Sequence, residues 1–332
     1  MAGNLSLTRE YQRIFTIMRD EFEPILWDNV SSRTALLFRM KEIGAIVEKG
    51  GLEHLRFNIL KELPTTEAYT DLDTLTPTRA DPVTSVVYEW KQLNSPVQVS
   101  GLDMIKTGDA SRPGLLQMFI EAAEISMRDA IGGSTVGIFS DAGESDLTKI
   151  SGLQNMLTST PTTGTVGQLS RASQSNWRHQ TEDVSNDFSA NGLNSMRTLY
   201  RECSRFDENV DTIVFNGSTM DNYERALTST FQVNLPLQPA QADQRMLDAG
   251  FPNILYKNAI VFNDDGVPAN AGYFLNLAKF TRLIVRSGRN AEIGDFVKSR
   301  DKDDLVTFVL WAGNLITTNL ARQGVLLNTD TW

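Results

Sequence analysis

Only a few residues of this chain are of the types that catalyse reactions, and they do not combine into a recognisable site. His54 and His179 lie in unrelated segments, and neither is close in sequence to Cys203. Cys203 falls on the apolar face of a predicted helix, where a thiol is normally an inert core residue. The sequence has no GxSxG, HExxH or CxxC motif. We therefore predict no catalytic residue and no enzyme activity.

Three further patterns look like binding sites but fail in detail. Gly132 and Gly137 stand five residues apart, but Ile follows where a phosphate loop needs Lys and then Ser or Thr. The aspartates of the 71–81 segment lack the turn glycine and closing glutamate of a calcium loop. Trp177-Arg178-His179 is a type that stacks on bases, although a surface or interface role is the simpler interpretation. We predict no metal and no cofactor.

Composition excludes several classes of protein. The 332 residues suffice for one large or two ordinary domains with a sizeable core. The net charge of −10 excludes a surface that binds nucleic acid everywhere, although a local basic patch fits. The single cysteine excludes an intrachain disulfide and fits a cytoplasmic site of folding. We see no secretory signal, and Leu305–Ile316 is too short for a membrane helix, so we expect no membrane partner.

One long amphipathic helix, predicted over 111–133, must be covered by other elements. A helix of this length spans about 30 Å. Gln117, Glu121, Glu124 and Arg128 are predicted to lie on the polar side. The apolar stripe consists of Leu115, Leu116, Phe119, Ile120, Ala123, Met127, Ala130 and Ile131.

The N-terminal region predicts two helices. Apolar spacing indicates the first over residues 5–27. The second is expected from about Ser32 to Ile43, with Ser31 or Ser32 as its cap and with Lys49-Gly50-Gly51 ending the helical region. These helices either pack on their own core or form an arm along a neighbouring subunit.

Residues 52–100 predict a long β-hairpin. Alternating apolar residues in 55–60 and in 86–99 indicate strands. The polar stretch between them, 64–82, has no periodicity, and a structureless loop of this length is uncommon inside a compact domain. An isolated hairpin is marginal in water, so we expect it to rest on another chain. The alternative is a loop folded over its own domain.

The rest of the chain alternates strands with helices. Residues 134–141 predict a buried strand, 189–206 a helix, and 211–216 a strand that leads directly into a helix capped by Ser218. Further strands are predicted at Leu255, 259–262, 273–277 and 283–285, and a strand-rich segment at 305–327, with a bulge or turn at Gly313-Asn314.

This order of elements resembles the major capsid proteins of tailed double-stranded DNA phages, the Hong Kong 97 type of coat fold. Three stretches carry the resemblance: ISGLQNML, DTIVFNGSTMDNYERAL and VLWAGNLITTNLARQGVL. It implies an α+β fold with an N-terminal arm (1–49), an extended β-hairpin loop (50–104) and an axial α/β domain (151–289). The peripheral domain would comprise 105–150 and 290–332, with a spine helix at 113–131. The strands of 305–327 would then cover the spine helix, bringing Phe119, Ile120 and Met127 to Val309 and Leu310.

The resemblance also implies a function and partners. The chain would be a major capsid protein that assembles with other copies, as hexamers and pentamers, into an icosahedral shell. The shell would be assembled in the host cytoplasm and become the virion capsid. Its implied partners are a separate scaffolding protein, a portal protein, packaged DNA bound non-specifically and, in some relatives, a decoration protein. Arg9, Arg13 and Arg19 are candidates for contact with the DNA.

The predicted contacts between subunits lie on the loop, where apolar residues supply area and charged residues set the register. They are Arg56, Phe57, Glu67, Asp71, Arg79, Tyr88 and Trp90. Some relatives join Lys to Asn covalently. Here Lys61 and Lys91 lie at the flanks of the loop and not in its tip, which disfavours a cross-link; the corresponding candidates for the Asn are Asn314 and Asn319. Two other functions remain open: an encapsulin-like cellular shell around an enzyme cargo, and an α/β enzyme whose site we do not recognise.

Overall fold

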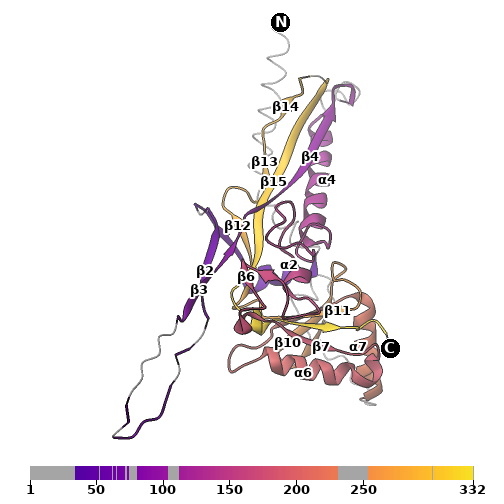
Figure 1. The fold of residues 1–332 in the computed structure, drawn as a ribbon. Coiled ribbons are helices and arrows are strands. Elements are labelled where there is room, and N and C mark those ends of the chain that lie inside the picture. The colour runs from indigo at the N-terminus through magenta and orange to yellow at the C-terminus, as the bar shows by residue number, and fades with distance from the viewer. Residues whose placement is uncertain are drawn as a thin grey trace.

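The computed structural model describes residues 34–331, except 52, 62, 65, 72, 75–80, 104–111, 231–252 and 301. The helix predicted at 5–27, Arg9, Arg13, Arg19 and Arg79 lie outside the described residues. Two six-stranded sheets organise the described part of the chain, and a hairpin projects away from both (Figure 1).

The first sheet is built around one long strand, β15 (Asp304–Thr317). On one side the Asp304–Gly313 part of β15 pairs antiparallel with the whole of β4 (Lys91–Ser100). On the other side it pairs with β12 (Thr281–Arg286) and with the short strands β13 (Glu292–Ile293) and β14 (Val297–Lys298). The bulge or turn predicted at Gly313-Asn314 is wrong, because both residues continue the strand and pair with β12 in unbroken register.

The predicted long helix is confirmed as α4 (Arg112–Gly132), which runs beside β4 and β15 (Figure 1). Its buried apolar stripe includes Ile120 and Met127, in the same cluster as Val309 of β15. The strand that lies directly along the helix is β4, which the sequence grouped with the loop. Glu124 and Arg128 are 3% and 2% exposed, so the polar side predicted for them is wrong. They flank the apolar stripe at four-residue spacing and are buried with it.

The segment 34–49 belongs to the core. Helix α2 (Ala35–Ile43) buries Leu36 and Met40, and Gly44, at φ 75°, ends it. Thr34 at its start makes no side-chain cap; instead, Asp264 Oδ2 accepts the Leu36 N–H at 2.9 Å. Strand β1 (Ile46–Lys49) then pairs parallel with β12. The helix end predicted at Ile43 is confirmed, but the residue that breaks the helix is Gly44 and not the 49–51 stretch. The cap predicted at Ser31 or Ser32 is wrong, because Thr34 occupies the N-cap position.

The second sheet has the strand order β7-β16-β11-β8-β10-β9. Its strands are β7 (Gln180–Asp183), β8 (Thr212–Phe215), β9 (Asn253–Tyr256), β10 (Ala259–Asn263), β11 (Ala271–Leu275) and β16 (Gly324–Leu327). Helices α6 (Leu193–Cys203) and α7 (Gly217–Thr230) cover one face (Figure 1). The strand-turn-helix predicted at 211–227 is confirmed. Its cap is Asn216, whose Oδ1 accepts the Thr219 N–H at 2.8 Å, and not Ser218.

The two sheets exchange strands across the predicted domain limits. β12 lies within 151–289 but pairs in the first sheet, and β16 lies within 290–332 but pairs in the second. The strand predicted at 134–141 is absent, since residues 133–139 form bends and turns that bury Ile138 and Phe139. Short elements complete this region: α5 (Leu153–Met156), β5 (Thr165–Val166), β6 (Leu169–Ser170), η1 (Ser175–Trp177), a π-helical turn (Phe188–Gly192) and η4 (Leu320–Arg322).

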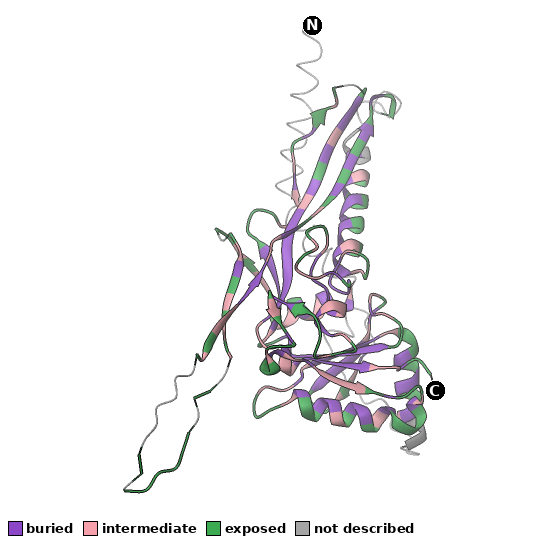
Figure 2. Cartoon of the chain, viewed as in Figure 1, coloured by how far each residue is buried: buried purple, intermediate pink, exposed green. Residues whose placement is uncertain are grey.

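The predicted hairpin is confirmed, but it is shorter than the sequence suggested. β2 (Leu55–Leu60) pairs antiparallel with β3 (Val83–Tyr88). Past these strands the Lys61 N–H donates to the Pro82 carbonyl at 2.8 Å. Figure 2 shows that burial falls off along the hairpin, away from the two sheets.

Candidate assembly surface

The base of the hairpin is part of the molecule's own core. Leu55, Val86 and Tyr88 are buried in the main apolar cluster. Tyr88 is 0% exposed, and its hydroxyl donates to the Thr317 carbonyl at 2.9 Å. Burial raises the pKa of its phenol above the ordinary value. The prediction that Tyr88 contacts another subunit is therefore wrong: its ring is fully used inside one chain.

A polar network fixes the segment that follows β3. The Glu89 N–H donates to Glu144 Oε2 at 3.0 Å, and Lys91 Nζ donates to the Glu144 and Asp146 carbonyls at 3.0 and 2.5 Å. The Ser151 hydroxyl donates to Glu144 Oε1 at 2.5 Å. Burial raises the pKa of Glu144 and lowers that of Lys91, because both lose solvation of the charged form. The network joins the hairpin to the 144–151 turn.

Asn314 of β15 completes this network. Its Nδ2 donates to the Glu89 carbonyl at 2.8 Å, and its Oδ1 accepts the Ser151 N–H at 3.0 Å. Asn314 and Lys91 are both 0% exposed. They serve as internal structural residues and are not presented to a neighbour as cross-linking partners.

The far part of the hairpin presents both apolar and acidic side chains to solvent. Glu67 and Asp71 are exposed in this far part, and Arg56 is exposed nearer the base, where it pairs with Val87. Exposed apolar side chains there are Leu60, Leu63, Tyr69 and Val83. Asp73 and Asp81 add to the acidic character of this end. Covering these apolar side chains with another chain would remove them from water and so stabilise the assembled state.

The remaining predicted contact residues lie near the base. Phe57 is half-buried, with the Lys49 ammonium 4.7 Å from its ring centroid. Trp90 is also half-buried, with the Arg286 guanidinium 5.9 Å from its ring centroid. Each is therefore only partly exposed.

A tight turn after α6 presents an aromatic side chain that the sequence analysis missed. Phe206 is 90% exposed and has φ 55°, a left-handed conformation that bulky residues rarely adopt. Arg205 and Glu208 exchange backbone hydrogen bonds of 3.1 and 3.0 Å across the turn. Lys279 pairs with Asp207 at 2.6 Å, and Arg322 with Glu208 at 2.9 Å. The turn is thus held in place while its ring points into solvent. The signal in the sequence was a Phe among charged residues, RFDE.

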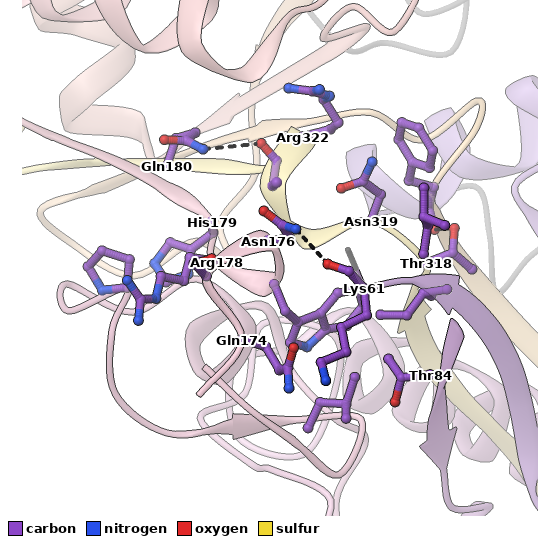
Figure 3. A pocket seen from close by; sticks show the side chains of 18 of the residues that line it. Lys61, Thr84, Gln174, Asn176, Arg178, His179, Gln180, Thr318, Asn319 and Arg322 are labelled. Carbon is purple, nitrogen blue, oxygen red and sulfur yellow. Dashed lines mark hydrogen bonds between the residues drawn. The ribbon is translucent and has the colours of Figure 1, made fainter. Parts of the chain in front are cut away.

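A cleft of about 960 Å³ separates the hairpin from the second sheet (Figure 3). Asn176 Nδ2 bridges it by donating to the Lys61 carbonyl at 2.6 Å. Among the described residues that line the cleft the charged side chains are all basic: Lys61, Arg178, Arg205 and Arg322. Two are engaged within the chain, since Arg178 Nε donates to the Arg171 carbonyl and Arg322 pairs with Glu208.

The Trp177-Arg178-His179 cluster is internal, and the surface interpretation is wrong for two of its members. Trp177 is buried, and its Nε1 donates to the Val166 carbonyl at 3.1 Å. His179 is buried between the Thr158 carbonyl (2.7 Å) and Arg171 (3.1 Å). Burial and the Arg171 charge lower its pKa to about 4, so His179 is neutral at pH 7. Both residues are structural.

The remaining chemical candidates also have structural surroundings. Cys203 is fully buried, and burial raises the pKa of its thiol, as expected for an inert core residue. His54 Nδ1 lies 2.7 Å from Glu89 Oε2 at the hairpin base. In the described part of the chain, no three His, Cys, Asp or Glu residues gather in a way that could hold a metal ion. None of the described helices is long and apolar enough to cross a membrane.

Comparison with solved structures identifies the fold. The structure matches a chain of the cyanophage A-1(L) capsid asymmetric unit at a TM-score of 0.61 and 13% identity, covering 88% of this chain and 93% of that one. It matches the capsid of an empty GTA particle at 0.59 and 12% identity, covering 87% and 88%. The chain has a phage capsid fold. The same fold accounts for a match to the holo-SrpI encapsulin complex from Synechococcus elongatus PCC 7942, at 0.50 and 13% identity, covering 86% and 85%. No protein-family model and no curated protein sequence matches the chain.

Proposed function

We propose that this chain is the major capsid protein of a tailed phage and that its copies form an icosahedral shell around double-stranded DNA. The observation that carries the proposal is the projecting hairpin. Its base is locked into the subunit core by Tyr88 and the Asn314 network, while its far part leaves apolar side chains in water. That arrangement is costly for a lone subunit and is stabilising once a neighbour covers the exposed side chains.

In this proposal the elements take the roles of the Hong Kong 97 type. The hairpin β2–β3 is the extended loop, and α4 is the spine helix, which lies with the first sheet in a peripheral domain. The second sheet with α6 and α7 is the axial domain. Strand β4 then belongs to the peripheral domain, β12 joins it from the middle of the chain, and β16 joins the axial domain from the end. Only residues before 34 remain to form an arm.

The proposed contacts between subunits are of two kinds. Arg56, Phe57, Trp90 and the acidic residues of the loop, with Arg79, reach a neighbouring copy. Phe206 is a second proposed anchor, because its backbone turn is held by hydrogen bonds and an aromatic side chain with two rotatable bonds loses little entropy on binding. Copies would form hexamers and pentamers. A scaffolding protein, a portal protein and a decoration protein are the proposed partners in the host cytoplasm, and the virion capsid is the product.

A second function has a specific observation behind it. The match to the holo-SrpI encapsulin complex supports a cellular shell that encloses a protein cargo. The two functions differ in their contents. Shells that hold DNA support the phage capsid, and shells that hold one co-purifying enzyme support the cellular compartment.

The hairpin can be tested by replacing residues 62–81 with Asn-Gly. The Lys61 to Pro82 hydrogen bond brings the ends together, so a two-residue turn can join them. We expect a folded subunit with an unchanged unfolding transition and no shells by negative-stain microscopy. A second variant keeps the length and changes Glu67, Asp71, Asp73 and Asp81 to amides, which isolates the role of charge. Closed shells from the shortened chain would refute the role given to the hairpin, and an unfolded subunit would place 62–81 in its own core.

A further inference from the structure

Three basic side chains gather on the outer side of the second sheet's helical layer. Arg197 and Arg201 are exposed on α6 and stand one helical turn apart. Lys257 lies in the turn between β9 and β10, with φ 54°. Burial and then the charges of Arg197 and Arg201 lower the pKa of Lys257, so the three cations are near enough to repel one another.

Two tyrosines hold the ammonium of Lys257 in this arrangement. Its Nζ lies 4.3 Å from the ring centroid of Tyr200 and 5.5 Å from that of Tyr256. The two rings pack edge to face with their centroids 5.8 Å apart. The aromatic faces attract the cation without neutralising it. The Lys257 ammonium therefore lies beside α6, against the Tyr200 ring that stands between Arg197 and Arg201 in the sequence.

The three cations form no ion pair with a carboxylate of the described residues. Glu202 is the one acidic residue of α6, and it is exposed. Three unneutralised cations within one patch are unusual in a chain of net charge −10. Mutual repulsion costs free energy in the isolated subunit, and an incoming polyanion would relieve that cost.

We propose that Arg197, Arg201 and Lys257 bind the phosphate backbone of the enclosed nucleic acid, which places the α6 face on the lumen of the shell. This inference rests on the proposed capsid function. The proposed contact is independent of base sequence, because hydrogen bonds from Arg and Lys to phosphate oxygens carry no sequence information. Duplex DNA suits the patch because it carries one negative charge per about 1.7 Å of its helix axis. At this spacing, each of three neighbouring cations can lie close to a phosphate.

The acidic hairpin of a neighbouring subunit is the competing ligand, and it fits less well. Its exposed carboxylates at Glu67, Asp71, Asp73 and Asp81 are spread over an extended stretch. Asp73 is moreover engaged by the Thr70 N–H at 2.7 Å and the Thr70 hydroxyl at 3.0 Å. Such a ligand presents its charges singly and not as a dense row.

The test compares two triple variants of the full chain. The patch variant carries Arg197→Gln, Arg201→Gln and Lys257→Asn, since Asn tolerates the left-handed conformation at 257. The control variant carries Lys298→Gln, Arg300→Gln and Lys302→Gln, which removes the same charge from another exposed cluster that has Asp301 and Asp303 beside it. Thermal unfolding verifies that both variants fold.

The readout is fluorescence anisotropy of a labelled duplex of about 30 base pairs, titrated between about 50 and 200 mM salt. Each phosphate contact contributes about 0.9 to the slope of log affinity against log salt. We expect the magnitude of this slope to be smaller by about 2 to 3 in the patch variant than in the wild type, and to be unchanged in the control variant. No binding by the wild type, an unchanged slope in the patch variant, or an equal loss in the control would overturn the inference.

Assembly of the same proteins separates this inference from the proposed function. Wild-type and patch-variant chains are both expected to form shells. If the wild type forms none, the capsid function fails whatever the slopes are. If shells form but the patch variant binds DNA as the wild type does, the lumen contact alone fails. Loss of shells with normal DNA binding in the patch variant would assign the patch to a neighbouring subunit and overturn the inference.

Discussion

At the scale of single residues, buried polar side chains determine how the hairpin is attached. Asn314 uses both ends of its amide to join Glu89 and Ser151, which come from separate segments. No apolar residue can replace it without leaving two buried backbone groups unpaired. The attachment of the candidate assembly surface therefore depends strongly on one side chain.

We expect Asn314→Ala to lower the free energy of unfolding by roughly 2 to 5 kcal/mol, because each orphaned group costs about 1 to 3 kcal/mol. Urea denaturation measures the change. Asn319→Ala is the matched control: Asn319 is only half-buried, makes no side-chain cap and is expected to change the value by less than about 0.5 kcal/mol. Equal effects of the two substitutions would contradict the role given to Asn314.

Glu124 gives the stability a dependence on pH. Burial, followed by the charge of Glu121, raises its pKa from 4.5 to about 7. The folded state therefore holds a proton that the unfolded state releases, and stability falls as pH rises from about 4.5 to about 7. We expect Glu124→Gln to raise the melting temperature at pH 8 and to change it little at pH 4.5.

The exposed Glu121 on the preceding turn provides the control for this prediction. Glu121→Gln removes the smaller of the two causes, so it is expected to reduce the difference between the two pH values only in part, whereas Glu124→Gln removes it. A Glu124→Gln variant that melts at the wild-type temperature at pH 8 would show that the carboxyl group carries no such penalty.

At the scale of elements, the sequence predicts what local periodicity determines. It locates α4, the paired strands of the hairpin and the β8–α7 unit, since apolar spacing and turn residues act within each segment. It misplaces Glu124 and Arg128, because burial of a flanking position depends on which elements pack there. It also misses the partners of β4, β12 and β16, because strand pairing between distant segments leaves no local pattern.

The residues of the candidate assembly surface also include some whose exposure a local sequence pattern predicts and some whose exposure only the packing decides. Glu67 and Asp71 lie in a polar loop and are exposed, which leaves their predicted contact with another subunit possible. Tyr88 has the same alternating pattern as an exposed strand residue, and only the packing of β3 on Thr317 shows that it is internal. Phe206 is the converse case: an aromatic residue normally predicts burial, and a strained turn exposes it instead.

The turn at 205–208 supplies a prediction of its own. Phe206→Gly relieves the left-handed strain, so we expect an unchanged free energy of unfolding or a gain of up to about 1 kcal/mol. Assembly should nevertheless be impaired, because the anchor is lost. Phe206→Tyr keeps the ring and should assemble normally. Light scattering and urea denaturation measure the two effects, and shells from Phe206→Gly in wild-type yield would remove Phe206 from the interface.

At the scale of the whole molecule, the two sheets hold each other through exchanged strands. β12 and β16 carry the chain from one sheet to the other, so neither sheet is continuous in sequence. Because the chain crosses between the two sheets at these strands, the sheets are joined in one subunit, and the hairpin projects from it. The net charge of −10 makes free copies repel one another, so assembly must draw on apolar contact and on partners that neutralise charge.

The most direct measurement is electron microscopy of the full chain, expressed alone and together with the neighbouring genes of its source. The account predicts closed icosahedral shells in which the β2–β3 hairpin of each subunit lies on another copy. Soluble monomers under every condition, or shells whose hairpins contact only their own subunit, would contradict it.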